Sequence, residues 1–333
     1  MSTQQIWKVI AGLSLGVILL LGIYRAGNWL EEKAEKPETR GDYRSRYQYD
    51  TLMEADGVSY RQKKNLTTVL LMGIDRPTSS EEGREFYRNQ GQADFLRLIV
   101  VDPTERTISQ IGIDRDTMTP IITMGILGDR SGERIAQISL SHSFGLAEEQ
   151  GCELTKEAVS HLFMDVPIDF YFSIGLDAIP VLNDLVGGVT MTLEEDFSEQ
   201  DPSMTPGTTL TLKGKQAEIY VRARHGVAEE TNESRMRRQE KYISSLMEKI
   251  GAMQRQDQQF SGELYDAMAP YMATNIGRGR FINEVWLNKD YERMPVVHLA
   301  GEHVIGSDGF MQFYVDQNDI QQKVLELFYD PVQ

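Results

Sequence analysis

Short apolar runs rich in strand-forming residues alternate with segments of helical character along most of this 333-residue chain. The first runs are TTVLLMGI (67–74), FLRLIVV (95–101, closed by Asp102-Pro103) and TISQIGI (107–113). Runs of this length and composition are typical of strands. Predicted strands follow at 170–174, 189–193, 207–212 and 296–300, and predicted helices at 155–163, 177–185, 215–224, 234–255 (capped by Ser234), 264–272 and 318–328. This interleaving predicts an α/β fold, a three-layer α/β/α domain with a mixed central sheet.

A long apolar stretch precedes that domain. Residues 9–24 (VIAGLSLGVILLLGIY) carry no charge, and apolar residues on either side extend the stretch to the roughly 20 residues that cross a bilayer. A cleaved signal peptide is the alternative, but Ala26-Gly27 is a poor cleavage site. We therefore predict an uncleaved transmembrane anchor over 9–30, with residues 1–8 in the cytoplasm and the rest of the chain outside the cell.

The remainder divides by composition. Residues 31–64 are polar and broken by Pro37 and Gly41, which indicates an extracellular stalk. A catalytic domain is predicted for 65–256. Residues 257–333, which carry no recognisable chemistry, are predicted as a C-terminal extension that packs on this domain or continues it.

Composition and charge narrow the function. Hydrophobic residues make up 41% and charged residues 25%, which is typical of a globular protein, and the formal net charge is −16. Nucleic acid requires a broad basic face, so we exclude it as a partner. The five histidines have no zinc spacing and are interpreted as structural or solvated, and the single cysteine, Cys152, as a small buried residue. Neither GxxxxGK[ST] nor GxSxG occurs, which argues against nucleotide-dependent and serine-hydrolase chemistry.

Five arginines nevertheless crowd into one region of this acidic chain: Arg222, Arg224, Arg235, Arg237 and Arg238. Guanidinium groups match phosphate and pyrophosphate oxygens in bidentate geometry. On the second predicted helix, Arg235, Arg238 and Gln239 share a face, whereas Arg237 points elsewhere. A solvated basic helix face is the other interpretation, but it leaves Arg222 and Arg224 unexplained.

Acidic residues mark the ends of the first predicted strands. Asp75 and Asp94 are separated by a polar loop that can bring them together, and a few carboxylates of this kind suit Mg²⁺ completed by water and substrate phosphates. Capping a turn is an equally good interpretation of each. After the third strand, Arg115 could reach a phosphate while Asp116 orients it or accepts a proton. Taken alone, this Asp114-Arg115-Asp116-Thr117 segment is better interpreted as a surface ion-pair cluster.

Six blocks, in this order and spacing, resemble the LytR-CpsA-Psr family of cell-envelope proteins. They are LLMGID (70–75), GQADFLRLIVVD (91–102), IGIDRDTM (111–118), IDFYFSI with LNDLVGGV (168–174 and 182–189), LKGKQAEIYVRAR (212–224) and NESRMRRQ (232–239). The resemblance implies an extracytoplasmic phosphotransferase in the cell membrane of a Gram-positive-type envelope. Such proteins take a glycopolymer, which is a teichoic acid or a capsular or secondary wall polysaccharide, from a polyprenyl-pyrophosphate carrier. They attach it to a peptidoglycan hydroxyl through a phosphodiester bond.

The resemblance also assigns residues. It implies that Asp75 and Asp94 hold Mg²⁺, with Mn²⁺ as the alternative, and that an apolar tunnel accepts the polyprenyl tail. The implied catalytic residues are Arg115, Asp116, Arg222 and Arg224, and the implied pyrophosphate-binding residues are Arg115, Arg222, Arg224, Arg235, Arg238, Gln239 and Gln92.

Two positions depart from the family pattern. Gln92-Ala93-Asp94 replaces a common Arg-Ser-Asp, which removes one cationic contact, and Asn232 stands where an acid is frequent. Two alternatives follow: a non-catalytic protein that binds lipid-linked glycopolymer or peptidoglycan, and a pyrophosphatase that uses water as the acceptor.

Overall fold

The computed structural model describes residues 52–55, 57–75, 91–125, 127–223 and 232–332, with the backbone alone for 232–236. All of them belong to one compact unit, Tyr49–Gln333. The anchor predicted for 9–30 and the stalk up to residue 51 lie outside the described residues. Within the described part of the chain, no helix combines the length and the apolar character needed to cross a membrane.

A mixed sheet forms the centre of this unit. Its six described strands lie in the order β11 (Met272–Thr274), β8 (Phe170–Gly175), β3 (Thr67–Asp75), β4 (Gln92–Asp102), β5 (Thr107–Ile113) and β12 (Glu292–His298). β8 runs parallel to β3 and β12 parallel to β5, and the other neighbours are antiparallel. The mixed sheet was predicted correctly, and so were the first three of its strands along the chain, β3, β4 and β5. β4 begins three residues earlier than expected, so Gln92 lies in a strand and not in the predicted loop, and Asp94, predicted at the strand border, lies inside the strand.

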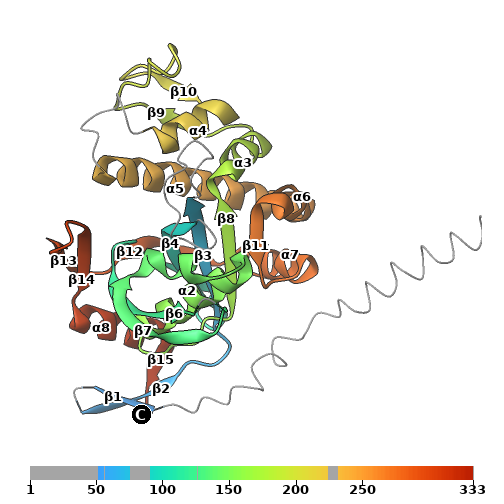
Figure 1. Ribbon diagram of the computed structural model, residues 1–333. Coiled ribbons are helices and arrows are strands. Elements are labelled where there is room, and N and C mark those ends of the chain that lie inside the picture. The colour runs from blue at the N-terminus through green and yellow to red at the C-terminus, as the bar shows by residue number, and fades with distance from the viewer. Residues whose placement is uncertain (1–51, 56, 76–90, 126, 224–231, 333) are drawn as a thin grey trace, which may run out of the picture. The chain divides into compact units, whose positions relative to one another are not determined.

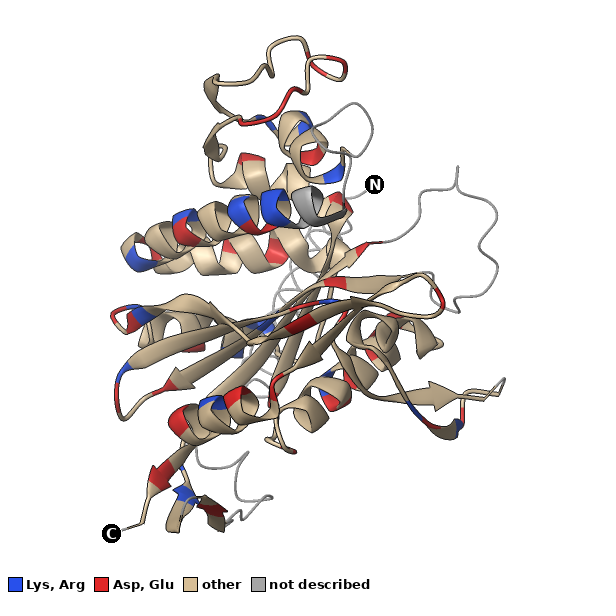
Figure 2. Ribbon diagram, turned by 90° about the vertical axis from the view of Figure 1, so that its left-hand side faces the viewer, with Lys and Arg blue, Asp and Glu red and all other residues tan. Residues whose placement is uncertain are grey.

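Helices lie on both sides of this sheet (Figures 1 and 2). Residues of β3 alternate between the two faces, and Leu70, Met72 and Ile74 are completely buried in the larger core. That face is covered by α2 (Glu148–Leu162) and α8 (Gln317–Phe328). The opposite face is covered by α3 (Ile179–Leu185), α4 (Gly214–Arg222), α5 (Asn232–Gln256), α6 (Gln258–Met268) and α7 (Arg278–Leu287), which share a second core. The three predicted layers are therefore present.

Smaller elements decorate these layers. Two hairpins, β6 (Met118–Met124) with β7 (Arg130–Gln137) and β13 (Gly301–Ile305) with β14 (Met311–Val315), and the pair β9 (Thr190–Thr192) with β10 (Thr209–Thr211) are antiparallel. The short 3-10 helices are η2 (Ile138–Leu140), η3 (His142–Phe144), η4 (Leu176–Ala178) and η5 (Ala269–Tyr271).

Two boundaries differ from the sequence prediction, and the C-terminal part follows the second of its two predicted alternatives. Within the predicted stalk, β1 (Leu52–Ala55) and β2 (Val58–Gln62) form a sheet with β15 (Tyr329–Pro331) from the other end of the chain. Residues beyond 256 supply both edge strands of the central sheet, so they continue the domain. Helix α5 begins at Asn232, which makes the predicted cap at Ser234 wrong.

Candidate active site

The candidate site lies where β3 ends and β4 begins. Asp75 pairs with Gln92 across the two strands, and the ladder has an irregularity one pair further along, between Gly73 and Ile74. Ile74 pairs with Ala93 and Gly73 with Phe95, which leaves Asp94 as an extra residue in β4. A bulge of this kind redirects a side chain. Here Ala93 stays in the core while Asp94 joins Asp75 and Gln92 at the strand ends.

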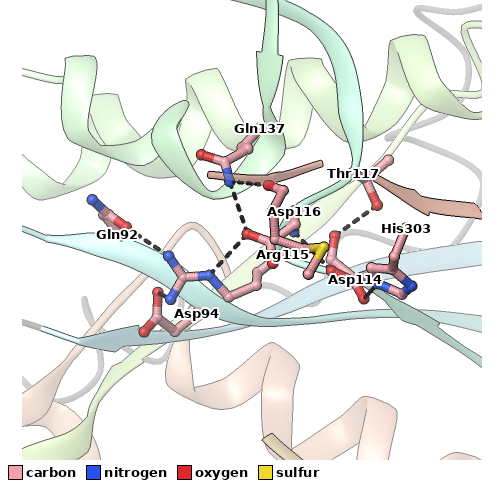
Figure 3. Close-up of polar contacts among 9 residues, drawn as sticks. Gln92, Asp94, Asp114, Arg115, Asp116, Thr117, Gln137 and His303 are labelled. Carbon is pink, nitrogen blue, oxygen red and sulfur yellow. Dashed lines mark hydrogen bonds and ion pairs between the residues drawn. The ribbon is translucent and has the colours of Figure 1, made fainter. Parts of the chain in front are cut away.

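Arg115 gathers acceptors from two elements. It follows β5, and its guanidinium forms an ion pair with Asp94 and donates from Nη2 to Gln92 Oε1 at 2.9 Å. Its Nε lies 3.6 Å from Asp116 Oδ1 (Figure 3). The Arg115 side chain is only 15% exposed, so the surrounding oxygens hold the guanidinium in one place.

Asp116 is the most buried acid of this group. Gln137 Nε2 donates to its Oδ1 at 3.0 Å, and its own amide donates to Asp114 Oδ1 at 2.8 Å. Burial raises the pKa of Asp116, an effect that the charge of Arg115 opposes and those of Asp114 and Asp94 reinforce. A carboxylate with a raised pKa is a better proton acceptor, which fits the role expected for this residue.

Arg222 approaches the same strand ends from the opposite layer. It is the last residue of α4, where a cation is favoured by the helix dipole. Its Nη1 lies 4.0 Å from Asp75 Oδ1, and its Nε lies 3.5 Å from Glu218 Oε1. Gln92 connects the two Asp–Arg pairs because it is the strand partner of Asp75 and the hydrogen-bond partner of Arg115. The structure thus brings together, from four separate segments, the predicted acids Asp75 and Asp94 and two of the predicted arginines, Arg115 and Arg222.

Arg238 and Gln239 have a different environment. Both are more than 90% buried on α5, and both donate to backbone carbonyls at the end of α4. Arg238 reaches Tyr220 O at 3.1 Å and Ala223 O at 2.7 Å, and Gln239 reaches Val221 O at 3.1 Å. Glu195 Oε2 lies 2.9 Å from Arg238 Nε. These contacts satisfy carbonyls that a helix end leaves without partners, and they fix the segment that carries Arg222.

The predicted pyrophosphate contacts of Arg238 and Gln239 stay predictions, since the described contacts use their donors for the backbone. Arg224 and the side chain of Arg235 lie outside the described residues, so their predicted roles also remain untested.

Sequence reasoning missed three contributors: Gln137 from β7, Glu195 from the loop after β9, and His303 from β13, whose Nε2 lies 2.9 Å from Asp114 Oδ2. Gln137 lies in a polar strand and His303 resembles the other histidines, so no local pattern distinguishes them. Their partners are distant in sequence and become neighbours only in the fold.

The acids fit a metal site of one particular kind. Among the described residues, no group of three or more His, Cys, Asp or Glu side chains could hold a metal ion. Asp75 and Asp94 offer two carboxylates at neighbouring strand ends, each beside an arginine. Mg²⁺ is commonly bound by one or two carboxylates together with waters and substrate phosphates. The donor set therefore fits Mg²⁺ that arrives with a phosphate ligand.

Known proteins resemble this chain in sequence. One is the polyisoprenyl-teichoic acid–peptidoglycan teichoic acid transferase TagU of Bacillus subtilis (strain 168), 32% identical over 162 residues, which are 49% of this chain and 45% of the relative. The chain thus spans less than half the length of that relative. TagU of Bacillus cereus (strain ATCC 14579) is 24% identical over 259 residues, covering 77% of this chain and 75% of the relative.

Solved structures share the fold at lower identity. B. subtilis TagV has a TM-score of 0.55 and 21% identity, over 79% of this chain and 97% of TagV. A structure of TagT bound to LIIa-WTA has a TM-score of 0.57 and 20% identity, over 79% of this chain and 89% of TagT. The sequence model of the LytR_cpsA_psr family matches residues 31–327, which include nearly the whole described fold. This chain therefore belongs to the LytR_cpsA_psr family.

Proposed function

We propose that this protein transfers a glycopolymer, a teichoic acid or a capsular or secondary wall polysaccharide, from a polyprenyl-pyrophosphate carrier to a hydroxyl of peptidoglycan. The observation that carries the proposal is the joined pair of Asp–Arg contacts, Asp75 with Arg222 and Asp94 with Arg115. Two guanidiniums and two carboxylates at neighbouring strand ends suit a pyrophosphate with its metal ion. The teichoic acid transferase names of the TagU relatives support the same reaction.

The residues suggest how the transfer proceeds. Arg115 and Arg222 bind the pyrophosphate oxygens and stabilise the charge that gathers on them as the phosphorus is attacked. Asp75 and Asp94 would hold Mg²⁺, which would neutralise further phosphate charge. Asp116, beside Arg115, accepts the proton of the attacking peptidoglycan hydroxyl. The new phosphodiester bond forms at the glycan-linked phosphorus, and polyprenyl phosphate leaves.

An apolar surface supports a lipid-linked donor. The side chains of β3 and β4 that face α2 are buried. On the other face, the apolar Val69, Leu71, Phe95 and Ile99 are only partly buried, and between them the buried Arg97 pairs with Glu240 of α5. Phe172 on β8 belongs to that face, where its ring lies 6.3 Å from Tyr265 of α6 and 5.4 Å from Phe281 of α7. Apolar area left accessible beside the site suits a polyprenyl tail.

The proposed location follows from the predicted anchor. Residues 9–30 hold the protein in the cell membrane as a single span with residues 1–8 in the cytoplasm, and the domain lies outside, where peptidoglycan is found.

A non-catalytic binding protein is the second candidate, and Gln92 favours it. Its amide oxygen accepts a hydrogen bond from Arg115 and adds no positive charge for the pyrophosphate. The third possibility keeps the site and uses water as the acceptor.

One incubation separates these functions. The full-length protein in detergent is mixed with lipid-linked glycan, Mg²⁺ and peptidoglycan oligomers. A product that carries both glycan and muropeptide supports transfer. Binding without turnover supports the second candidate, and release of free phosphorylated glycan supports hydrolysis.

Two substitutions test the proposed site. We expect Arg115→Ala and Arg222→Ala each to lower turnover by at least about 100-fold, because each removes positive charge from the transition state. Arg130→Ala is the matched control, since Arg130 is a surface arginine paired with Glu157. Activity equal to that of the control in either variant would contradict the assignment.

A third substitution tests the metal. We expect Asp94→Asn to raise the Mg²⁺ concentration needed for half-maximal turnover by about 10-fold, since one anionic ligand is lost. An unchanged Mg²⁺ dependence would remove Asp94 from the metal site.

A further inference from the structure

The hairpin β13–β14, from the C-terminal part of the chain, contacts the Asp114–Thr117 turn directly. Phe313 of β14 donates its amide to Asp116 O at 2.8 Å and forms a parallel bridge with Thr117. His303 of β13 places its Nε2 2.9 Å from Asp114 Oδ2 (Figure 3). Backbone and side chain of the hairpin therefore meet the same short turn.

Asp114 transmits the contact of His303 toward the site. Its Oδ2 faces His303, and its Oδ1 accepts the amide of Asp116 at 2.8 Å. The ring of His303 packs on Phe313 with centroids 4.5 Å apart, which limits the orientations available to it. One carboxylate thus connects the hairpin to the backbone of Asp116, the residue next to Arg115.

Gln137 makes a second connection. Its amide nitrogen carries two hydrogens, and the two acceptors lie at hydrogen-bond distance: Asp116 Oδ1 at 3.0 Å and Met311 O of β14 at 2.6 Å. The carboxylate of Asp116 is therefore oriented by a side chain whose other hydrogen bond ends on the hairpin.

We propose that the β13–β14 hairpin is a positioning element of the site and that His303 is a positioning residue, acting through Asp114 on Asp116 and Arg115. Its effect on turnover rests on the proposed transferase function. The His303 side chain is 49% exposed, so its pair with Asp114 adds little to global stability. The pair affects the geometry of the site, and small displacements of reacting groups lower the reaction rate strongly.

Two variants separate the effect of the hydrogen bond of His303 from the effect of its ring. His303→Gln retains an N–H donor for Asp114, whereas His303→Phe retains a ring against Phe313 and loses the donor. His161→Phe serves as the control, because His161, in the last turn of α2, also lies near an aspartate: its Nε2 is 3.9 Å from Asp165 Oδ1, just beyond the helix. All variants are made in the full-length protein.

Hydrogen exchange tests the positioning without any assumption about substrate. We expect the amides of Asp116 and Thr117 to exchange at least about fivefold faster in His303→Phe, because local opening becomes easier. In His303→Gln and His161→Phe they should exchange as in the wild type. Exchange in His303→Phe equal to that of the wild type would overturn the proposal.

Kinetics test the consequence. We expect kcat for glycan transfer to fall about 10-fold in His303→Phe, with KM for the lipid-linked donor within about twofold of wild type, and His303→Gln to recover most of the rate. Equal kcat in His303→Phe and the control would contradict the proposal. A wild type without any transfer would instead contradict the proposed function, and the exchange experiment would still decide the role of the hairpin.

Discussion

The stability of the fold and the proposed reaction place opposite requirements on the charge of Asp116. Its side chain is almost completely buried between Arg115 and Gln137, and burial raises its pKa. An acid whose pKa is higher in the folded than in the unfolded state stabilises the fold while it is protonated, below its ordinary pKa of 3.8. That contribution is lost as pH rises through the raised value. At neutral pH the ionised Asp116 is therefore a cost to stability, retained at the position where the proposed reaction needs a base.

Replacing this acid should separate stability from activity. We expect Asp116→Asn to lower turnover at least about 10-fold while leaving the free energy of unfolding at pH 7 unchanged or higher by about 1 kcal/mol, because a buried charge is removed. The stability advantage of Asp116→Asn over the wild type should shrink as pH falls toward 3.8, because the wild-type acid is then protonated and also uncharged. Thermal unfolding at stepwise pH measures it. A stability loss that is the same at every pH would contradict the account.

Individual site residues were predictable to different degrees. Asp75, Asp94 and Arg115 follow or interrupt apolar strands, and Arg222 ends an amphipathic helix, so their charges stand out from the local pattern. Gln137 and His303 could not be found in this way. Each is an ordinary polar residue in an exposed hairpin, and its partner becomes a neighbour only through tertiary structure.

Helices α4 and α5 are joined by hydrogen bonds at the site. The sequence predicted α4 to reach Arg224, but the helix ends at Arg222 because Ala223 leaves the helical conformation with φ −58° and ψ 130°. Arg238 of α5 then donates to Ala223 O and Tyr220 O. The arginine that the sequence assigned to the ligand thereby fixes the end of the neighbouring helix.

This role gives Arg238 a measurable effect on both stability and binding. We expect Arg238→Met to lower the free energy of unfolding by about 3 kcal/mol, because two carbonyls lose their donor and Glu195 is left as a poorly compensated acid. KM for the donor should rise, since Arg222 is no longer held in place. Denaturant titration and steady-state kinetics measure the two effects.

The matched control for this substitution is Arg237→Met, at the adjacent, exposed position of the same helix. We expect it to change stability by less than about 0.5 kcal/mol. If Arg238→Met has the stability of the control but loses donor binding, Arg238 contacts the ligand directly and the sequence prediction was the better one.

The inner strands of the central sheet were the most predictable elements. Strands β3, β4 and β5 contribute fully buried residues such as Leu70, Leu98 and Ile111, and their apolar runs are evident in the sequence. The strands β7 and β13 were missed, since they are largely exposed and lack a buried face that would impose alternation.

At the scale of the whole molecule, the C-terminal part of the described chain pairs with strands from its beginning and its middle. β12 pairs in parallel with β5, β11 pairs with β8 at the other edge, and β15 pairs with β2. Parallel pairing of segments so far apart in sequence leaves no local signal, which is why the sequence placed a boundary after residue 256. The C-terminal part in fact closes both edges of the central sheet, and its hairpin reaches the site.

Truncation tests this unity. We expect a chain that ends at residue 256 to show no cooperative thermal transition, because β5 and β8 each lose one of their two strand partners and α8 no longer covers the core that contains Val159. A chain that lacks residues 1–48 should unfold cooperatively with the midpoint of the full-length protein, since the remaining residues form one compact unit. Near-ultraviolet circular dichroism during heating distinguishes the two. Cooperative unfolding of the 256-residue chain would mean that the sheet is stable without its edge strands. The C-terminal part would then be an appended layer, and its contacts with the Asp114–Thr117 turn would form only after the site has folded.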